Sequence, residues 1–230
     1  MRTDCHVNLT GVALTSDEIE RDVTLGTSAH AALMTRLAAL ADEDRLEVAD
    51  ASRLPGWNRA QVITHLARNA DGHRRMIEGA GRGEILEQYP GGVATRQHGI
   101  DAGVDRTSTE VLADLSAAIG ALEAAWSSTD WRGVGHRTVR GDTPIGRLPF
   151  LRVREVALHG VDLDIGIELS DLDPLYVRLE IGRLEMLWSA RQPMGMTPLP
   201  NAVLSLDPPT RLGWLTGRVD VDGVDPAGVF

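Results

Sequence analysis

Cysteine is nearly missing from the sequence, which limits the chemistry that the protein can do by itself. The chain of 230 residues has one cysteine, Cys5, so no disulfide can form within it. Cys5 precedes the first predicted helix, and nothing around it is typical of a reactive thiolate. Thiol chemistry would therefore need a thiol from outside the protein.

Long apolar runs and basic runs are missing as well. No segment approaches the ~20 apolar residues that cross a bilayer, and the N-terminus lacks the apolar stretch of a signal peptide. We therefore expect a cytoplasmic protein with no membrane partner. The chain has 23 basic and 33 acidic residues, a net charge of −10. Because attraction to phosphates dominates nucleic-acid binding, DNA and RNA are not expected as partners.

The composition that remains is that of a globular protein. Hydrophobic residues make up 43% of the chain and charged residues 24%, whereas disordered chains have less of the first. The length suits one large domain, or a domain of about 150 residues followed by a smaller one. We favour the second arrangement, and we expect a monomer or a weak dimer.

Four segments repeat apolar residues at three- and four-residue steps, which predicts four helices. Three of them open with a capping box, in which two side chains three residues apart bond each other's backbone N–H groups. The pairs are Thr15 with Glu18, Asn58 with Gln61, and Thr107 with Glu110. The helices should end near Ala41, Gly79, Trp126 and Gly166, and the fourth begins at Pro144 or Pro149. Four amphipathic helices of this kind can share one core as a bundle.

The segments between and after these helices are less regular. Residues 84–106 have no sustained period, so we expect a long loop near a cleft. Residues 127–142 are polar and rich in turn residues, which favours a hairpin.

The sequence changes character after residue 170, where a helix to about Ala190 precedes prolines and a strand-like run over 201–206. The fold class is therefore mainly α. We expect a four-helix bundle over residues 1–170 and a small α+β domain over residues 171–230.

The fourth predicted helix carries a polar face inside an otherwise apolar stretch. Glu155, His159 and Asp162 fall within about 60° of arc on a helix, so two carboxylates and an imidazole share one side. A carboxylate with a neutral imidazole is a ligand set for zinc and similar ions. The same spacing also serves as a simple ion pair within a helix, and Asp162 is either a partner of His159 or a solvated acid.

A third ligand must come from another helix. His65 lies within the apolar run 62–67, where a buried imidazole needs a partner. Two histidines and one glutamate would leave coordination positions open, as catalytic zinc sites do. The alternative is that His65 is an ordinary core histidine.

Other residues are given simpler interpretations. We expect His30 to be a core histidine with a backbone partner, and His73 to be a surface or loop residue. Trp57 is expected to pack as a hydrophobic staple at the start of the second helix.

Four motifs occur in order within residues 20–168. They are Leu25-Gly26-Thr27-Ser28, Leu54-Pro55-Gly56-Trp57-Asn58, Val62-x-x-His65-Leu66-Ala67-Arg68-Asn69 and Arg152-x-Arg154-Glu155-x-x-x-His159-x-Val161-Asp162-Leu163. In type and spacing they resemble the mycothiol-dependent maleylpyruvate isomerases of actinobacteria, which belong to the DinB-like metalloproteins.

The resemblance implies a DinB-like bundle in which His65, Glu155 and His159 hold a zinc ion. Mycothiol is implied as a cosubstrate that supplies the thiol. Asp162, Asn69 and Trp57 are expected to support the ligands or to bind substrate.

The C-terminal part resembles the family less closely. Members carry a small α/β domain in which an arginine after a short helix is needed for activity. The best counterpart is Trp214-Leu215-Thr216-Gly217-Arg218, so the resemblance implies a catalytic role for Arg218. Arg211 is the alternative, and Arg218 as a surface arginine is the third possibility. The strands that precede this helix in the family are abbreviated here.

The implied reaction is the thiol-assisted, zinc-assisted cis–trans isomerisation of maleylpyruvate to fumarylpyruvate in gentisate breakdown, or of a close analogue. One alternative is a mycothiol S-transferase that acts on electrophiles or antibiotics and uses the same metal and thiol. Another is a non-catalytic, zinc-binding bundle that acts as a regulator. The sequence does not separate the first two.

Overall fold

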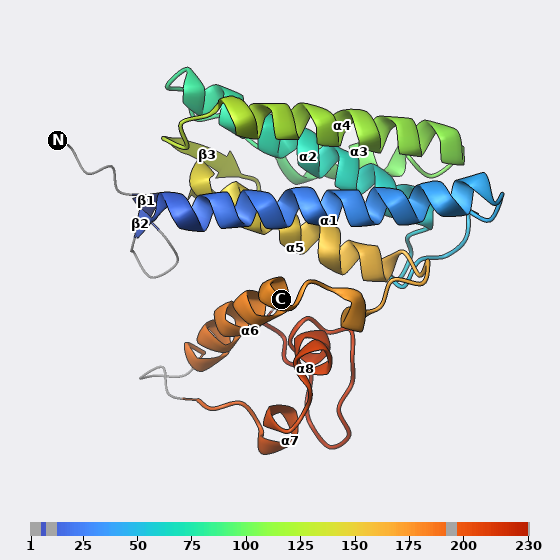
Figure 1. Cartoon of the computed structure of the whole chain (residues 1–230), viewed down its shortest axis with the longest axis vertical. Coiled ribbons are helices and arrows are strands. Elements are labelled where there is room, and N and C mark those ends of the chain that lie inside the picture. Colours follow the sequence, from blue (N-terminus) through green and yellow to red (C-terminus); the bar gives the residue numbers. More distant parts are fainter. Residues whose placement is uncertain (1–5, 8–12, 192–196, 230) are drawn as a thin grey trace. The chain divides into compact units, whose positions relative to one another are not determined.

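The structure is a computed structural model that describes residues 6–7, 13–191 and 197–229. Figure 1 shows it to be mainly helical. Cys5, on which the expectation of an external thiol partly rests, lies outside the described residues. Within the described part of the chain, no helix is long and apolar enough to cross a membrane.

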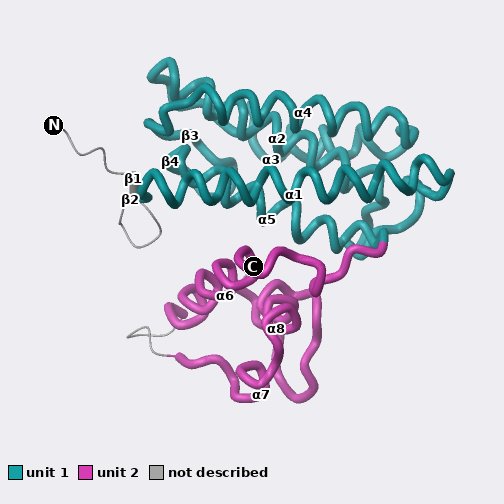
Figure 2. The backbone as a smooth tube through the Cα atoms, in the orientation of Figure 1, with its two compact units in different colours: residues 1–165 teal, residues 166–230 magenta. Residues whose placement is uncertain are grey.

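Two compact units divide the chain, residues 1–165 and 166–230 (Figure 2). From the sequence we predicted this boundary at residue 170. Four long helices form the core of the first unit. They are α1 (Ser16–Asp42), α2 (Arg59–Gly81), α4 (Ser108–Ser128) and α5 (Leu148–Asp162).

The four long helices pack as a closed ring. α2 lies along α4 and α1 along α5, while α2 also contacts α5 and α1 contacts α4. Their facing sides are apolar, and Leu37, Ile63, Leu66, Leu115 and Leu122 are fully buried there. The expected four-helix bundle is confirmed.

All three predicted capping boxes are confirmed. Thr15, Asn58 and Thr107 are the N-caps of α1, α2 and α4, and each exchanges hydrogen bonds with the residue three positions later. These local bonds satisfy backbone N–H groups that the first helical turn leaves free. The start of α2, and with it the height of His65 along the bundle, is therefore defined by its own sequence.

The expected loop over residues 84–106 is wrong in part, because it contains α3 (Gly92–Asp101). α3 packs on α2 and buries Ile100 completely. A helix of 10 residues with one buried side chain leaves no period to detect. Its N-cap, Gly91, has a φ of 87° and no side chain that could mark the helix start.

Short strands complete the first unit. β1 (His6–Val7) pairs with β2 (Ala13–Leu14), and β3 (Val134–Arg137) forms a hairpin with β4 (Gly141–Pro144), as expected for residues 127–142. A 3₁₀ turn, η1 (Ile145–Arg147), leads into α5. α5 ends at Asp162, four residues earlier than predicted, because Asp164 takes a left-handed φ of 53°.

The second unit contains η2 (Leu169–Asp171), α6 (Pro174–Ser189), α7 (Asn201–Leu204) and α8 (Pro208–Leu215). The strand expected over residues 201–206 is wrong, because that segment forms α7. In the described part of this unit the β-pairing is limited to a bridge between Val221 and Val224. Without a neighbouring strand, the apolar run buries Val203 on a single helical turn instead.

Candidate metal centre

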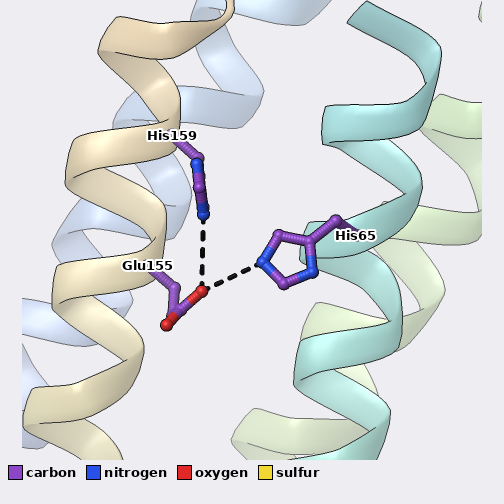
Figure 3. A group of neighbouring side chains, drawn as sticks. All are labelled: His65, Glu155 and His159. Carbon is purple, nitrogen blue, oxygen red and sulfur yellow. Dashed lines mark hydrogen bonds and ion pairs between the residues drawn. The ribbon is translucent and has the colours of Figure 1, made fainter. Parts of the chain in front are cut away.

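Two helices of the bundle bring three predicted ligands together (Figure 3). Glu155 and His159 lie on successive turns of α5, and His65 faces them from α2. Glu155 Oε2 lies 3.0 Å from His65 Nε2 and 3.5 Å from His159 Nε2. One donor atom from each residue can be chosen so that all lie within 4.8 Å of one another.

The cluster is buried on one side and open on the other. The side chain of His65 is 2% exposed, whereas those of Glu155 and His159 are 24% and 18% exposed. The α5 side of the cluster is therefore reachable from solvent, while the α2 side is closed by the core.

Asp162 fixes the orientation of His159. Its Oδ2 lies 2.8 Å from Nδ1 of His159, and the side chain is 2% exposed. The alternative of a solvated acid is therefore wrong. Because Nδ1 is held by Asp162, Nε2 of His159 is the nitrogen that remains for the cluster. This pairing of imidazole and carboxylate is the usual companion of a metal-binding histidine.

The two histidines experience different environments. Burial, the largest influence, lowers the pKa of His65 to about 4, so its imidazole is neutral near pH 7. Burial also acts to lower the pKa of His159, but hydrogen bonds with Asp162 and Glu155 outweigh it and raise that pKa. For Glu155, burial acts to raise the pKa, and hydrogen bonds from His159 and His65 hold it well below its ordinary value.

These residues fit a divalent cation. Two imidazole nitrogens and a carboxylate oxygen are a zinc ligand set. A second carboxylate, that of Asp162, contacts the other ring nitrogen of His159. The raised pKa of His159 shows that these carboxylates favour a positive charge at the cluster, which a cation would also supply. The described residues supply only three clustered candidate ligands, which leaves coordination positions for a substrate.

One contact would change when His65 binds an ion. Arg96 of α3 lies 3.4 Å from Nδ1 of His65, a long distance for a hydrogen bond. A histidine that coordinates through Nε2 carries its proton on Nδ1, where two donors would face each other. Arg96 would then lose this acceptor, and its guanidinium could donate to another one.

Trp57 and Asn69 occupy different places around the cluster. The ring of Trp57 meets His65 edge-on, with 5.7 Å between centroids, so Trp57 contacts a candidate ligand directly. Asn69 is buried and accepts a hydrogen bond from Arg152. Asn69 thus supports the core behind the cluster.

The sequence missed a buried network beneath the cluster. Arg152, one turn before Glu155, is fully buried and donates to His30 Nε2, to the Leu66 carbonyl and to Asn69. The expected backbone partner of His30 is wrong, because its ring binds the side chains of Arg152 and Glu123. The position of Arg152 within an apolar helical segment could have indicated a buried arginine with polar partners.

His73 also differs from its expected place. The sequence placed it on the surface or in a loop, but it lies on α2 and is 1% exposed. It lies one turn from the buried residues Ala70, Met76 and Ile77 of α2, and β3 packs on the same helix. Burial lowers the pKa of His73 to about 3.

The two candidate arginines lie in the second unit. Arg211 on α8 donates to the carbonyls of Leu204 and Leu206 and lies 3.6 Å from Glu185. Arg218 follows α8, is half-buried and donates to the carbonyl of Thr216. The side chain of Arg211 thus holds α7 and α6 to α8.

Comparison with known proteins gives the family of the chain. The family model described as the mycothiol maleylpyruvate isomerase N-terminal domain matches residues 27–164. The chain belongs to this family. The matched region includes His65, Glu155 and His159. The resemblance that the motifs indicated is therefore confirmed.

Solved structures of the isomerase family share the fold. The crystal structure of the mycothiol-dependent maleylpyruvate isomerase is 21% identical, with a TM-score of 0.74, and the match covers 87% of this chain and 90% of that one. A histidine-to-alanine mutant of that enzyme matches equally well in fold, at 20% identity, a TM-score of 0.74 and the same coverage. None of the curated proteins compared matches this sequence.

Proposed function

We propose that the protein catalyses the mycothiol-dependent cis–trans isomerisation of maleylpyruvate to fumarylpyruvate, or of a close analogue, with a zinc ion held by His65, Glu155 and His159. Membership of the isomerase family supports an enzyme that depends on a thiol. The metal assignment rests on the convergence of three donor atoms within 4.8 Å, in a cluster whose α5 side is reachable from solvent.

The reaction must overcome the barrier to rotation about a carbon–carbon double bond. A thiolate that adds to one alkene carbon turns the double bond into a single bond, and the electron pair moves to the conjugated carbonyl oxygen as an enolate. Rotation follows, and collapse of the enolate expels the thiolate and restores the double bond in the trans form. Thiolate and proton are returned, so the thiol is a cosubstrate that is not consumed.

The described residues supply the surroundings for this chemistry. Glu155 and the two imidazoles form the ligand set, and Asp162 holds His159 in one orientation with Nε2 toward the cluster. A bound zinc ion supplies Lewis acidity, which favours a thiolate near neutral pH and stabilises developing negative charge on oxygen. Since the sequence has a single cysteine near its start, we assign the nucleophile to the thiol of mycothiol.

Arg218 is assigned to one carboxylate of the substrate. This assignment rests on the resemblance of residues 214–218 to the family. A guanidinium matches a carboxylate with two parallel hydrogen bonds and stays charged at any working pH.

An assay of the zinc-loaded protein with maleylpyruvate, with and without mycothiol, tests the proposal. We expect turnover that needs both the thiol and the metal, with the Glu155→Gln variant as the matched control. Absence of turnover with mycothiol would contradict the isomerase assignment.

A cobalt-substituted sample separates the alternatives. A spectral change on adding mycothiol, without isomerase turnover, would indicate an S-transferase. An unchanged spectrum would indicate a non-catalytic metal-binding bundle.

A further inference from the structure

A cavity lies beside the metal centre, between α2 and the segment that contains α3. Its volume is about 440 Å³, and four arginines line it: Arg68, Arg74, Arg75 and Arg96. Arg96 connects the cavity to the cluster, because it lines the cavity and also contacts Nδ1 of His65. The imidazole ring of His65 therefore contacts Arg96 through Nδ1 and Glu155 through Nε2.

Three of these arginines already have partners or face solvent. Arg68 forms ion pairs with Asp114 and Asp71, and Arg74 forms one with Glu78 at 2.6 Å. Arg75 is exposed and donates to the carbonyl of Glu87. Their charges are balanced by carboxylates or by water.

Arg96 differs from the other three. It is half-buried, and no carboxylate of the described residues lies within ion-pair distance of it. Its contacts are the ring nitrogen of His65 and the face of Trp57, 6.0 Å from its guanidinium carbon. A half-buried guanidinium without a counter-charge can be stabilised by an anionic ligand.

Tyr89 adds a second unused donor to the cavity wall. The residue is 8% exposed, and its buried hydroxyl lies beside the Arg96 guanidinium but has no acceptor for its proton among the described residues. Burial, the largest influence, raises the pKa of Tyr89 to about 12, while the charge of Arg96 acts to lower it. The hydroxyl therefore keeps its proton and can donate it in a hydrogen bond.

We propose that Arg96 and Tyr89 form a carboxylate-binding subsite that holds one end of a small dicarboxylate whose other end reaches the metal cluster. The proposal deepens the proposed function and rests on it for the identity of the ligand. A carboxylate suits the site because the one unmatched guanidinium offers two parallel N–H donors. Asp71 and Glu78 in the same wall disfavour a group with more negative charge, such as a phosphate.

Calorimetric titration with maleate, a stable cis-dicarboxylate, tests the subsite. We expect the zinc-loaded protein to bind maleate, and Arg96→Gln to raise the Kd at least tenfold. Tyr89→Phe should raise it about threefold, because one neutral hydrogen bond is lost. The matched control is Arg74→Gln, which removes a cavity arginine that Glu78 already pairs, and its Kd should stay within about twofold.

Three further measurements separate the subsite from general effects. The uncharged diamide of maleic acid should not bind the parent, and each variant should keep its zinc content and its melting temperature. If Arg96→Gln does not fold, Arg96→Lys replaces it. We expect that variant also to bind more weakly, because an ammonium lacks the planar fork.

Several results would overturn the subsite. They are maleate binding that Arg96→Gln leaves unchanged, equal weakening by Arg74→Gln, and no maleate binding to the parent. An isomerase assay without turnover, together with Arg96-dependent maleate binding, would reject the proposed function and keep the subsite. Turnover with maleate affinity independent of Arg96 would reject the subsite alone.

Discussion

At the scale of single residues, His159 has a central position because both of its ring nitrogens face a carboxylate. Nδ1 lies 2.8 Å from Asp162, and Nε2 lies 3.5 Å from Glu155. The first contact fixes the ring, and the second directs the free nitrogen into the cluster. The ring of His65 stands at 88° to it, so the two imidazoles approach the cluster from different directions.

We predict that His65→Ala, Glu155→Ala and His159→Ala each remove most of a bound divalent ion. The parent should hold about one ion per chain, and three protein ligands leave no redundancy. Metal analysis by mass spectrometry after dialysis measures this. His136→Ala is the control, since that histidine is 43% exposed and belongs to no cluster of candidate ligands in the described structure. Full occupancy in His159→Ala would show that the ligand assignment is wrong.

Asp162→Asn should weaken metal binding without abolishing it. The amide keeps the shape of the carboxylate but loses the charge that orients His159 and raises its basicity. We expect the affinity for zinc to fall about 10- to 100-fold. Competition with a zinc chelator measures the change, and Asp142→Asn, which alters the exposed partner of His136, is the matched control. Equal affinities of parent and Asp162→Asn would contradict the role of Asp162.

At the scale of elements, α2 carries His65 and also forms the floor of the arginine-lined cavity. Gly72 lies on the same face of α2, where a Cβ atom would meet Gln88 Cγ at 2.7 Å and the Gln88 carbonyl oxygen at 3.0 Å. That segment cannot shift freely, because the backbone N–H of Gln88 donates to the carbonyl of His136. Gly72 therefore permits the close approach that places Tyr89 in the cavity wall.

Gly72→Ala is predicted to destabilise the protein even though alanine favours a helix by about 1 kcal/mol. Displacing the segment around Gln88 should cost about 1–3 kcal/mol, which outweighs that gain. Gly120→Ala on α4 is the control, since a Cβ there meets nothing within 4 Å, and it should stabilise by about 0.5–1 kcal/mol. Urea denaturation distinguishes the two. A stabilising Gly72→Ala would show that the contact is easily relieved.

Elements were predicted well wherever neighbouring residues determine them. The capping boxes at Thr15, Asn58 and Thr107 depend on bonds across three residues, so the sequence alone located three helix starts. The sequence did not reveal α3 or α7. Each is short and buries one side chain, so its conformation depends on what it packs against.

At the scale of the whole molecule, both units are expected to contribute to activity. We predict that Arg218→Ala keeps its bound metal and lowers kcat/KM by about 10² or more, as expected when an arginine–carboxylate contact of roughly 3 kcal/mol is lost. Arg218→Lys should recover little of the activity. Steady-state kinetics with mycothiol measure both.

The control for Arg218 is Arg211→Ala. Its guanidinium holds elements of its own unit, so we expect lower stability and retained activity. If Arg211→Ala is inactive and Arg218→Ala turns over normally, the two roles must be exchanged. If both variants are active, the second unit has no catalytic part.

Buried neutral histidines should make the stability of the metal-free protein depend on pH. Burial is the largest cause that lowers the pKa of His30 to about 2 and that of His73 to about 3. Below about pH 6.5 the unfolded chain binds more protons at these residues than the folded chain, so stability falls as pH falls. Between pH 7 and 5.5 we expect the two to reduce the free energy of unfolding by about 2 kcal/mol.

Chemical denaturation at pH 7 and 5.5 measures this loss, and His73→Gln should reduce it by about 1 kcal/mol. The substitution removes one of the buried neutral histidines, which also include His65, that gain a proton on unfolding. An undiminished loss in His73→Gln would assign the pH dependence to other groups.

Local sequence determined the helices of the bundle and the shared face of Glu155, His159 and Asp162, because bonds and angles within one helix set both. The tertiary structure alone decided what meets that face. His65 is 90 residues from Glu155, and the distance between them depends on how α2 packs against α5. The same holds for Arg152 beneath the cluster and for Arg96 beside it. Their environments arise from burial against distant segments, which no pattern of neighbouring residues encodes.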